Sequence, residues 1–447
     1  MLIKFRLKNF KSYKDLQEFS MIAGNSKQYL ERVLDKITYS LLKFSAIYGA
    51  NGSGKTNLID ALSTMQKLIV LGRPNFVLHT AFKLDDISKK EPTYFETILL
   101  IDEKVYSYGF EFCSDNNKFT SEWLTLINGK KDVDIFTRDL INGDYKANKE
   151  ADTLSDGKLN MYLDDMKNDD TKLFLNFINS NKNSAVIEKN KSIKMVYDWF
   201  NDNLVISEPE DIITSGDYFM VDSKIKELAN LLNAFGTGIQ SIKDVVVDPD
   251  TAYQSIPRKM IEDLQKKALE SYDHKIDALM RTDISFWHIS VDEEKVIFKK
   301  VCFFHDENQK YPFILDEESS GTIRLIDIAE TLLTNKNHCL FVIDELDRKL
   351  HPQLTCKFIE MFLESCKKND NQLIVSTHES RLLDFNLLRR DEIWFANKEK
   401  NGESKIYSLE EFNVRFDKKI DKAYLDGRYG GVPVFDTVFP TFGKCRE

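Results

Sequence analysis

Apolar and charged residues alternate at the start of the chain. The run from Ile3 to Leu7 reads Ile-Lys-Phe-Arg-Leu, which has the two-residue period of a strand with one buried face. Residues 44–48, Phe-Ser-Ala-Ile-Tyr, are typical of a short buried strand, and between Asn57 and Leu71 the apolar positions recur at helical spacing. The pattern predicts a strand, a glycine-rich turn at 49–56 and a helix, in that order.

Residues 93–139 have a different character. They contain runs rich in β-branched and aromatic residues, and one run is followed by Asn128-Gly129, a typical hairpin turn. We expect an antiparallel β-subdomain in this region.

The middle of the chain, residues 140–284, is charged and rich in asparagine, with helical apolar spacing at 193–204 and 225–235. After it, strand-like and helical runs alternate. We therefore predict an α/β fold: a mixed sheet with flanking helices and the antiparallel β-subdomain, interrupted by a helical insertion. Residues 1–139 and 285–447 would form the two halves of this α/β domain, and residues 140–284 the insertion.

A phosphate-binding motif occupies the predicted turn. Residues 49–56, Gly-Ala-Asn-Gly-Ser-Gly-Lys-Thr, match the GxxxxGK[ST] pattern and lie between a strand and a helix, as the motif requires. Glycines allow successive N–H groups to converge on phosphate oxygens, and the helix N-terminus adds a positive dipole end. We expect Lys55 to contact the β- and γ-phosphates and Thr56 to ligate Mg²⁺. The predicted nucleotide-binding residues are Gly49, Asn51, Gly52, Ser53, Gly54, Lys55 and Thr56.

A second motif supplies carboxylates. The apolar run Cys339–Ile343 ends in Asp344 and Glu345, the arrangement of a Walker B strand. We assign Asp344 to the Mg²⁺ shell and Glu345 to the attacking water, so that the chain binds and hydrolyses a nucleoside triphosphate, which we take to be ATP. Asp344 lies 289 residues after Lys55 (344 − 55), so a large segment separates the two halves of the site.

Two further motifs flank the Walker B strand. Residues 319–322, Ser-Ser-Gly-Thr, precede a predicted helix, and such a turn at a helix N-terminus is a second anion site. The apolar strand 372–377 is followed by His378, whose imidazole could sense a γ-phosphate. Each feature is ordinary alone, but their order along the chain indicates one nucleotide site.

Composition limits the class of partner. The net charge of −10 argues against a surface that is basic throughout and coats nucleic acid. It does not exclude a local basic groove. No apolar run reaches the ~20 residues that cross a bilayer, and the first residues lack signal-peptide features, so we expect a cytoplasmic protein without a membrane partner. A GTPase would need an NKxD loop, whereas residues 397–400, Asn-Lys-Glu-Lys, end in lysine.

The four motifs, in this order, resemble the ATP-binding-cassette ATPase head in its soluble SMC-like branch. Residues 8–13, Lys-Asn-Phe-Lys-Ser-Tyr, are similar to the N-terminal turn of such heads, which implies that Lys11 and Ser12 approach the nucleotide. Residues 347–352 and the segment 423–430, Ala-Tyr-Leu-Asp-Gly-Arg-Tyr-Gly, resemble AAA-type ATPases of bacterial phage-defence and abortive-infection operons, which are relatives of the ATPase half of OLD nucleases.

This resemblance implies a head that closes on a second copy of itself, as a homodimer or higher oligomer. Ser319, Ser320, Gly321 and Thr322 of one subunit would complete the ATP site of the other, with Asp347 as the D-loop. The signature reads Glu-Ser-Ser-Gly-Thr rather than Leu-Ser-Gly-Gly-Gln, and we assign no Q-loop glutamine.

The resemblance also implies a partner on another chain. Only 69 residues follow His378 (447 − 378), too few for a Toprim nuclease domain. We therefore expect a separately encoded nuclease or toxin effector, which the ATPase controls when it senses infection. The alternative is a DNA-repair or chromosome-maintenance head that clamps DNA on ATP-driven dimerisation. Salt-sensitive affinity for duplex DNA would favour that alternative.

Overall fold

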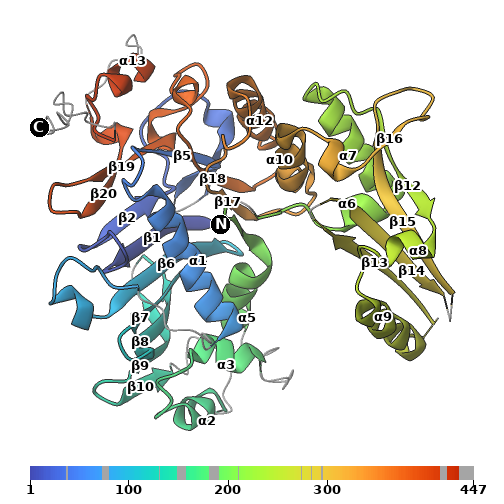
Figure 1. The fold of residues 1–447 in the computed structure, drawn as a ribbon. Helices are drawn as coiled ribbons and strands as arrows, with labels where there is room; N and C mark the ends of the chain where they lie inside the picture. The colour runs from blue at the N-terminus through green and yellow to red at the C-terminus, as the bar shows by residue number, and fades with distance from the viewer. Residues whose placement is uncertain are drawn as a thin grey trace, which may run out of the picture. The chain divides into compact units, whose positions relative to one another are not determined.

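The computed structural model describes residues 1–36, 39–72, 80–129, 131–147, 158–180, 191–209, 211–272, 274–282, 284–292, 295–412 and 420–431 (Figure 1). The chain divides into two units, which are described separately. The first unit comprises Met1–Pro209, Lys336–Leu346 and Leu363–Glu447, and the second comprises Glu210–Asn335 and Asp347–Phe362.

A six-stranded sheet of the first unit carries the predicted nucleotide motifs. Its strand order is β11-β17-β18-β5-β19-β20, and every neighbouring pair is parallel except β19 and β20. The short apolar runs before the P-loop and before Asp344 form fully buried strands, as predicted, because a parallel sheet is covered on both faces. The strands are β11 (Leu204–Ser207), β17 (Leu340–Ile343), β18 (Gln372–Ser376), β5 (Phe44–Tyr48), β19 (Ile393–Lys398) and β20 (Ser404–Ser408).

A seven-stranded antiparallel sheet forms the other layer of this unit, in the order β10-β9-β8-β7-β6-β1-β2. The predicted β-subdomain is thus confirmed, and the N-terminal strand pairs with it through β6. A two-stranded ribbon, β3 (Val33–Asp35) with β4 (Ser40–Leu42), is separate. The strands of the large sheet are β1 (Leu2–Lys8), β2 (Gln17–Ser20), β6 (Thr93–Ile101), β7 (Lys104–Cys113), β8 (Lys118–Ile127), β9 (Val133–Asp139) and β10 (Asp144–Ala147).

Helix α1 (Lys55–Leu71) contributes to one core that both sheets share. Its apolar positions bury Leu58, Leu62 and Met65 in the same cluster as side chains of the antiparallel and parallel sheets. Phe19 and Trp394 link the two sheets directly, with ring centroids 4.9 Å apart. The other α-helices in the described part of this unit are α2 (Lys158–Asp165), α3 (Phe174–Ser180), α5 (Lys191–Asp198) and α13 (Ile420–Leu425), and a π-helical turn spans Trp199–Asn203.

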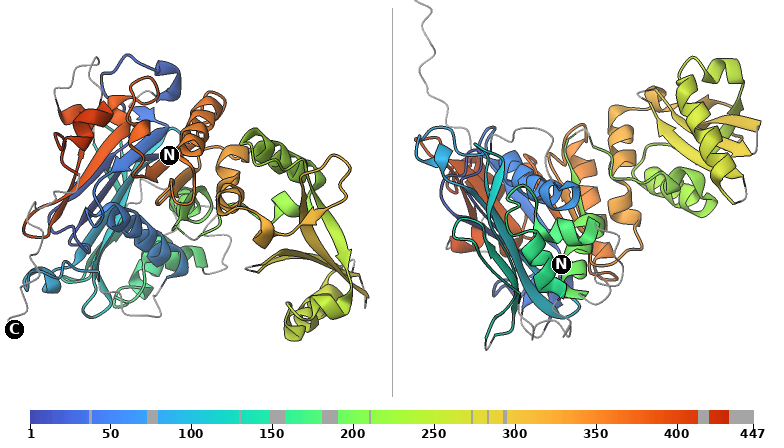
Figure 2. Two further views of the ribbon diagram at one scale, coloured as in Figure 1. Left: turned by 45° about the horizontal axis from the view of Figure 1, so that its top comes forward. Right: turned by 90° about the horizontal axis from the view of Figure 1, so that it is seen from below.

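The second unit has its own sheet and core. Strands β12-β15-β14-β13 are antiparallel neighbours, and β16 pairs with β15. Helices α8 and α9 pack on this sheet (Figure 2). Their apolar side chains share a core with Trp287 and Ile289 of β14. The strands are β12 (Ser241–Val247), β13 (Lys275–Arg281), β14 (Phe286–Asp292), β15 (Lys295–Phe304) and β16 (Pro312–Phe313). The helices are α6 (Asp217–Met220), α7 (Asp222–Ala234), α8 (Pro249–Ala252), α9 (Arg258–Glu270), α10 (Ser320–Ile328), α11 (Glu330–Leu333) and α12 (Pro352–Ser365), whose end lies in the first unit.

The α/β fold with its antiparallel subdomain is as predicted, but the segment 140–284 is not a purely helical insertion. It supplies β11 to the six-stranded sheet, and it supplies β12 and β13 to the sheet of the second unit. The predicted boundaries after residues 139 and 284 also differ from those of the two units, which change near residues 209 and 335. β11 is four residues long, too short to show a period, and the charged residues of β12 and β13 weaken their strand signal. Among the described residues, no helix is both long and apolar enough to cross a membrane.

Candidate functional site

The carboxyl ends of three neighbouring parallel strands, β17, β18 and β5, meet at one edge of the six-stranded sheet. The P-loop follows β5, Asp344 and Glu345 follow β17, and His378 lies two residues after β18. Backbone hydrogen bonds hold the ends of these strands together. The Thr377 N–H donates to the Ile47 carbonyl oxygen at 3.1 Å, and the Leu346 N–H donates to the Ser376 carbonyl oxygen at 3.0 Å. In open α/β sheets this edge is where ligands bind.

The glycines of the P-loop are required by its geometry. Gly52 and Gly54 have φ angles of 76° and 113°, which side chains other than glycine rarely adopt. A Cβ on Gly49 would lie 2.4 Å from Ser53 Oγ and 2.5 Å from the Ala396 carbonyl oxygen. The loop therefore packs tightly on β19 and leads directly into α1, which begins at Lys55.

The two P-loop side chains that are predicted to contact phosphate and Mg²⁺ differ in exposure. The Lys55 ammonium is buried, and it donates to the carbonyl oxygens of Gly49 at 2.7 Å and Ala50 at 3.3 Å. Thr56 is exposed at the first turn of α1, while Ser53 is buried and Asn51 is exposed. Lys55 and Thr56 thus stand at the helix N-terminus that the sequence predicted, where a phosphate chain would be stabilised by the dipole.

The N-terminal turn packs against the P-loop. Tyr13 Oη donates to the Gly54 carbonyl oxygen at 2.9 Å, and burial raises the pKa of Tyr13 well above its ordinary value. Ser12 Oγ accepts from Asn57 Nδ2 at 2.7 Å, on the first turn of α1. Lys11 Nζ pairs with Asp60 of the same helix at 2.5 Å. Ser12 and Lys11 are therefore beside the P-loop helix, and their contact with a nucleotide stays a prediction.

The Ser376 hydroxyl contacts both Walker B residues, through the carboxylate of Asp344 and the backbone N–H of Glu345. Asp344 is 1% exposed, and its Oδ1 accepts a hydrogen bond from Ser376 Oγ. The same hydroxyl oxygen accepts from the Glu345 N–H at 2.8 Å. Glu345 has a φ of 48°, and a left-handed conformation in a residue other than glycine costs roughly 1–2 kcal/mol. Strained residues of this kind concentrate at functional sites, where neighbouring contacts hold them in place.

The oxygen donors present suit Mg²⁺. Mg²⁺ binds through one or two carboxylates together with substrate phosphates, rather than in an all-protein cage. The Asp344 carboxylate and the exposed Thr56 hydroxyl are donors of this type, at the edge where the P-loop lies. Over the ranges that the structure describes, no three or more His, Cys, Asp or Glu side chains gather into a separate metal site.

Sequence reasoning missed one strand at this edge. β11 is the parallel neighbour of β17, and the Ser207 carbonyl oxygen accepts from the Asp344 N–H at 3.0 Å. Glu208 follows at the carboxyl end of this strand and pairs with Lys67 of α1 at 3.0 Å. The only sequence signal was the run Leu-Val-Ile-Ser before Glu208, which is too short to distinguish a strand from the end of the preceding helix.

The predicted signature belongs to the second unit. Ser319 is the N-cap of α10: its Oγ accepts from the Thr322 N–H at 3.0 Å, so the turn caps a helix as predicted. Ser319 and Ser320 are exposed, and Thr322 is buried. A Cβ on Gly321 would lie 3.1 Å from the Lys349 carbonyl oxygen. Asp347 belongs to the same unit as the signature, whereas Lys55, Asp344, Glu345 and His378 belong to the first.

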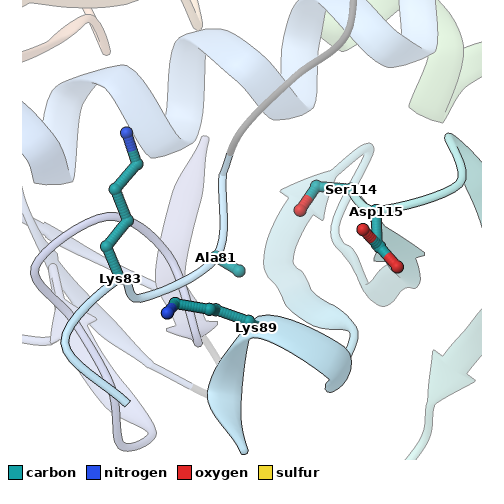
Figure 3. Close-up of a pocket in the computed structure, with 5 residues that line it drawn as sticks. All are labelled: Ala81, Lys83, Lys89, Ser114 and Asp115. Carbon is teal, nitrogen blue, oxygen red and sulfur yellow. The ribbon is translucent and has the colours of Figure 1, made fainter. Parts of the chain in front are cut away.

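Two cavities lie outside the P-loop. One, of about 460 Å³, adjoins the signature in the second unit and includes His305, whose Nε2 is 2.8 Å from Glu318 Oε1. The other, of about 500 Å³, belongs to the first unit; Figure 3 shows Lys83 and Lys89 on one side of it and Ser114 and Asp115 on the other, with Ala81 between. Lys89 is paired with Asp86 at 2.7 Å. The lining of neither cavity includes Lys55, Thr56, Asp344, Glu345 or His378.

Comparison with known proteins places the chain in a family. Residues 44–384 match the family model described as "AAA domain, putative AbiEii toxin, Type IV TA system", which covers more than half of the chain. No curated protein matches the chain.

Solved structures of SMC heads are similar at low identity. The SMC head bound to the C-winged helix domain of ScpA is 15% identical, with a TM-score of 0.38 over 91% of this chain and 97% of that one. The SMC head domain from Thermotoga maritima is 14% identical, with a TM-score of 0.33 over 91% and 98%. The SMC head with an extended coiled coil, bound to the C-terminal domain of ScpA derived from Pyrococcus furiosus, is 14% identical, with a TM-score of 0.36 over 96% and 99%. Likenesses this distant carry no conclusion about activity or partners.

Proposed function

The chain belongs to the AAA-domain family whose description names the AbiEii toxin and type IV toxin–antitoxin systems, and from this premise we propose that it is an ATPase. It binds ATP with Mg²⁺ at the P-loop edge of the six-stranded sheet and hydrolyses it there. The observation that carries the proposal is the convergence of the P-loop, Asp344, Glu345 and His378 at one sheet edge, where Ser376 Oγ bonds to both the Asp344 carboxylate and the Glu345 N–H.

Each side chain has a distinct role in this proposal. The P-loop N–H groups and Lys55 bind the phosphate chain, and Thr56 and Asp344 would hold Mg²⁺, which neutralises charge on the phosphate oxygens. Glu345 orients the attacking water, and its half-exposed carboxylate leaves room for one. His378 is exposed at the end of β18, where its imidazole would contact the γ-phosphate.

A second copy of the chain would complete the site. Ser319 and Ser320 are exposed at the N-terminus of α10, and their hydroxyls and the helix dipole favour an anion. We infer that Ser319, Ser320, Gly321, Thr322 and Asp347 of one copy close over the nucleotide held by the P-loop of another. Hydrolysis would then depend on assembly.

The biological role we propose is the control of a separate effector. The family description supports a toxin-associated or abortive-infection system, and the proposed partner is a separately encoded toxin or nuclease. The relation to OLD nucleases stays a prediction. The alternative, a DNA clamp, predicts salt-sensitive affinity for duplex DNA in the presence of ATP, and the net charge of −10 favours the effector role.

Two variants test the ATPase. Lys55→Ala removes the buried ammonium, and we expect it to abolish ATP binding in a calorimetric titration. Lys118→Ala removes an exposed lysine of β8 that pairs with Asp170 and serves as the matched control. ATP affinity at the wild-type level in Lys55→Ala would contradict the proposal.

Glu345→Gln separates binding from hydrolysis. Because glutamine keeps the shape but not the charge, we expect wild-type ATP affinity, loss of phosphate release and an ATP-dependent dimer in gel filtration. The control is Glu364→Gln at an exposed position of α12. An elution volume that ATP does not change would argue against a site shared between copies.

A further inference from the structure

The C-terminal segment 420–431 packs on the first residue of the P-loop. It consists of α13 and residues 426–431, which follow this helix, and it contains the sequence motif that the nucleotide chemistry leaves without a role. Tyr424 and Tyr429 are buried, while the intervening residues 425–428 are exposed. The buried tyrosines therefore anchor a segment that otherwise lies at the surface.

Aromatic stacking fixes this segment to the central sheet. Tyr424 and Tyr429 both stack on Phe395 of β19, with ring centroids 5.6 and 5.7 Å away and interplanar angles of 23° and 19°. Tyr424 also meets Tyr48 edge-on at 5.8 Å, and Tyr48 is the last residue of β5, immediately before Gly49. Offset-stacked and edge-to-face pairs of this kind are favourable beyond the area they bury.

The Tyr424 hydroxyl lies between the C-terminal segment and the P-loop. It donates to the Gly431 carbonyl oxygen at 3.2 Å, and the backbone of Gly49 lies near enough to oppose the rise in its pKa that burial causes. Burial raises the pKa of Tyr424 to about 12, so the hydroxyl keeps its proton at neutral pH. The Gly431 N–H donates to Asn397 Oδ1 at 3.2 Å, which holds the other side of the loop to β19.

No side chain fits where the two glycines meet. Gly431 has a φ of 68°, and a Cβ there would lie 3.2 Å from Gly49 Cα and 3.4 Å from the Ala396 carbonyl oxygen. Gly49 itself has no room for a Cβ against the same carbonyl. The backbones of the P-loop, β19 and the C-terminal loop are thus in direct contact at one point.

We propose that segment 420–431 is a positioning element of the nucleotide site, in which Tyr424 and Gly431 hold Gly49 in the conformation that binds phosphate. The proposal rests on the proposed ATPase function. Loss of the contact should weaken nucleotide binding and leave the fold intact, because the P-loop glycines have conformational freedom that the contact removes.

The test measures the affinity of the full chain for a non-hydrolysable ATP analogue with Mg²⁺, together with the unfolding midpoint without nucleotide. Tyr424→Phe removes only the hydroxyl and should weaken affinity about fivefold, the effect of one net hydrogen bond. Gly431→Ala inserts a methyl group against Gly49 and should weaken affinity by about tenfold or more. Leu425→Ala, in the exposed part of the segment, is the control and should bind as the wild type does.

The outcomes separate this proposal from the ATPase function. If the wild type binds the analogue and Lys55→Ala does not, the ATP site is established. Tyr424→Phe with wild-type affinity would then overturn the positioning role alone, even if Gly431→Ala fails to fold. Weaker affinity of Tyr424→Phe, with an unfolding midpoint equal to that of Leu425→Ala, would support it, since a merely structural tyrosine would lower the midpoint instead.

Discussion

Replacing Ser376 by alanine removes one hydroxyl that touches both Walker B residues. Ser376 Oγ donates to the carboxylate of Asp344 and accepts from the Glu345 N–H, and both Ser376 and Asp344 are almost fully buried. In the variant, the Asp344 carboxylate loses this hydrogen-bond donor. The Glu345 N–H loses its acceptor, which helps to hold Glu345 in its left-handed conformation. We therefore expect Ser376→Ala to impair hydrolysis through the orientation of the two carboxylates.

The size of the effect follows from the lost contact. A hydrogen bond to a charged group contributes roughly 1.5–3 kcal/mol. If this free energy is lost mainly in the transition state, kcat falls by about 10- to 150-fold. The P-loop contacts are unchanged, so the Kd for ATP should change by less than about threefold. We therefore expect kcat to fall while the Kd for ATP stays nearly constant.

The assay is phosphate release at saturating ATP, combined with a calorimetric Kd and a denaturant midpoint. Ser45→Ala is a matched control: Ser45 is equally buried on the neighbouring strand β5, and its hydroxyl donates to the Glu392 carbonyl oxygen at 3.1 Å rather than to a carboxylate. Wild-type kcat in Ser376→Ala, alongside an inactive Glu345→Gln, would refute the positioning role of this hydroxyl. An equal loss of kcat in Ser45→Ala would refute it as well.

Two further predictions concern stability. Burial raises the pKa of Glu392 to about 8, so the protonated form favours the fold, and this contribution is lost as the pH rises from about 4.5 through 8. Glu392→Gln, which stays neutral, should flatten the decline of unfolding free energy over that range; an unchanged pH profile would contradict the assignment. Arg138 and Glu122 form a fully buried ion pair at 3.0 Å, and Arg138→Met should cost about 3–5 kcal/mol in urea unfolding. Adding Glu122→Gln should restore part of the lost free energy of unfolding, because it removes the unpaired buried charge. If the double variant is no more stable than Arg138→Met, the broken ion pair is not the cause of the loss.

Local patterns were sufficient to predict the P-loop and the Walker B strand. The strand before Gly49, the glycines and the helix from Lys55 are consecutive in sequence, so period and motif describe them completely. Asp344 could be predicted in the same way, because an apolar run ends directly before it. Their convergence could be expected, because parallel strands end at a common sheet edge.

Contacts that depend on register and topology could not be predicted. The link from Ser376 to Asp344 and Glu345 requires β18 to lie beside β17 in one particular register, which no local pattern encodes. β11 joins the same sheet from the middle of a segment with helical spacing, and the tertiary context decides its conformation. The packing of Gly431 on Gly49 joins residues at opposite ends of the chain, and the sequence marks it only by a glycine pair.

We propose that ATP is hydrolysed at a site shared between two copies of the chain. The most direct measurement mixes two inactive variants, Lys55→Ala and Ser320→Glu; the second places a charge at an exposed first-turn position that suits a helix N-terminus but repels phosphate. In a two-fold dimer, mixed pairs have one intact site, so an equal mixture should recover about a quarter of the wild-type phosphate release. A mixture as inactive as its components, or Ser320→Glu with full activity alone, would contradict the account.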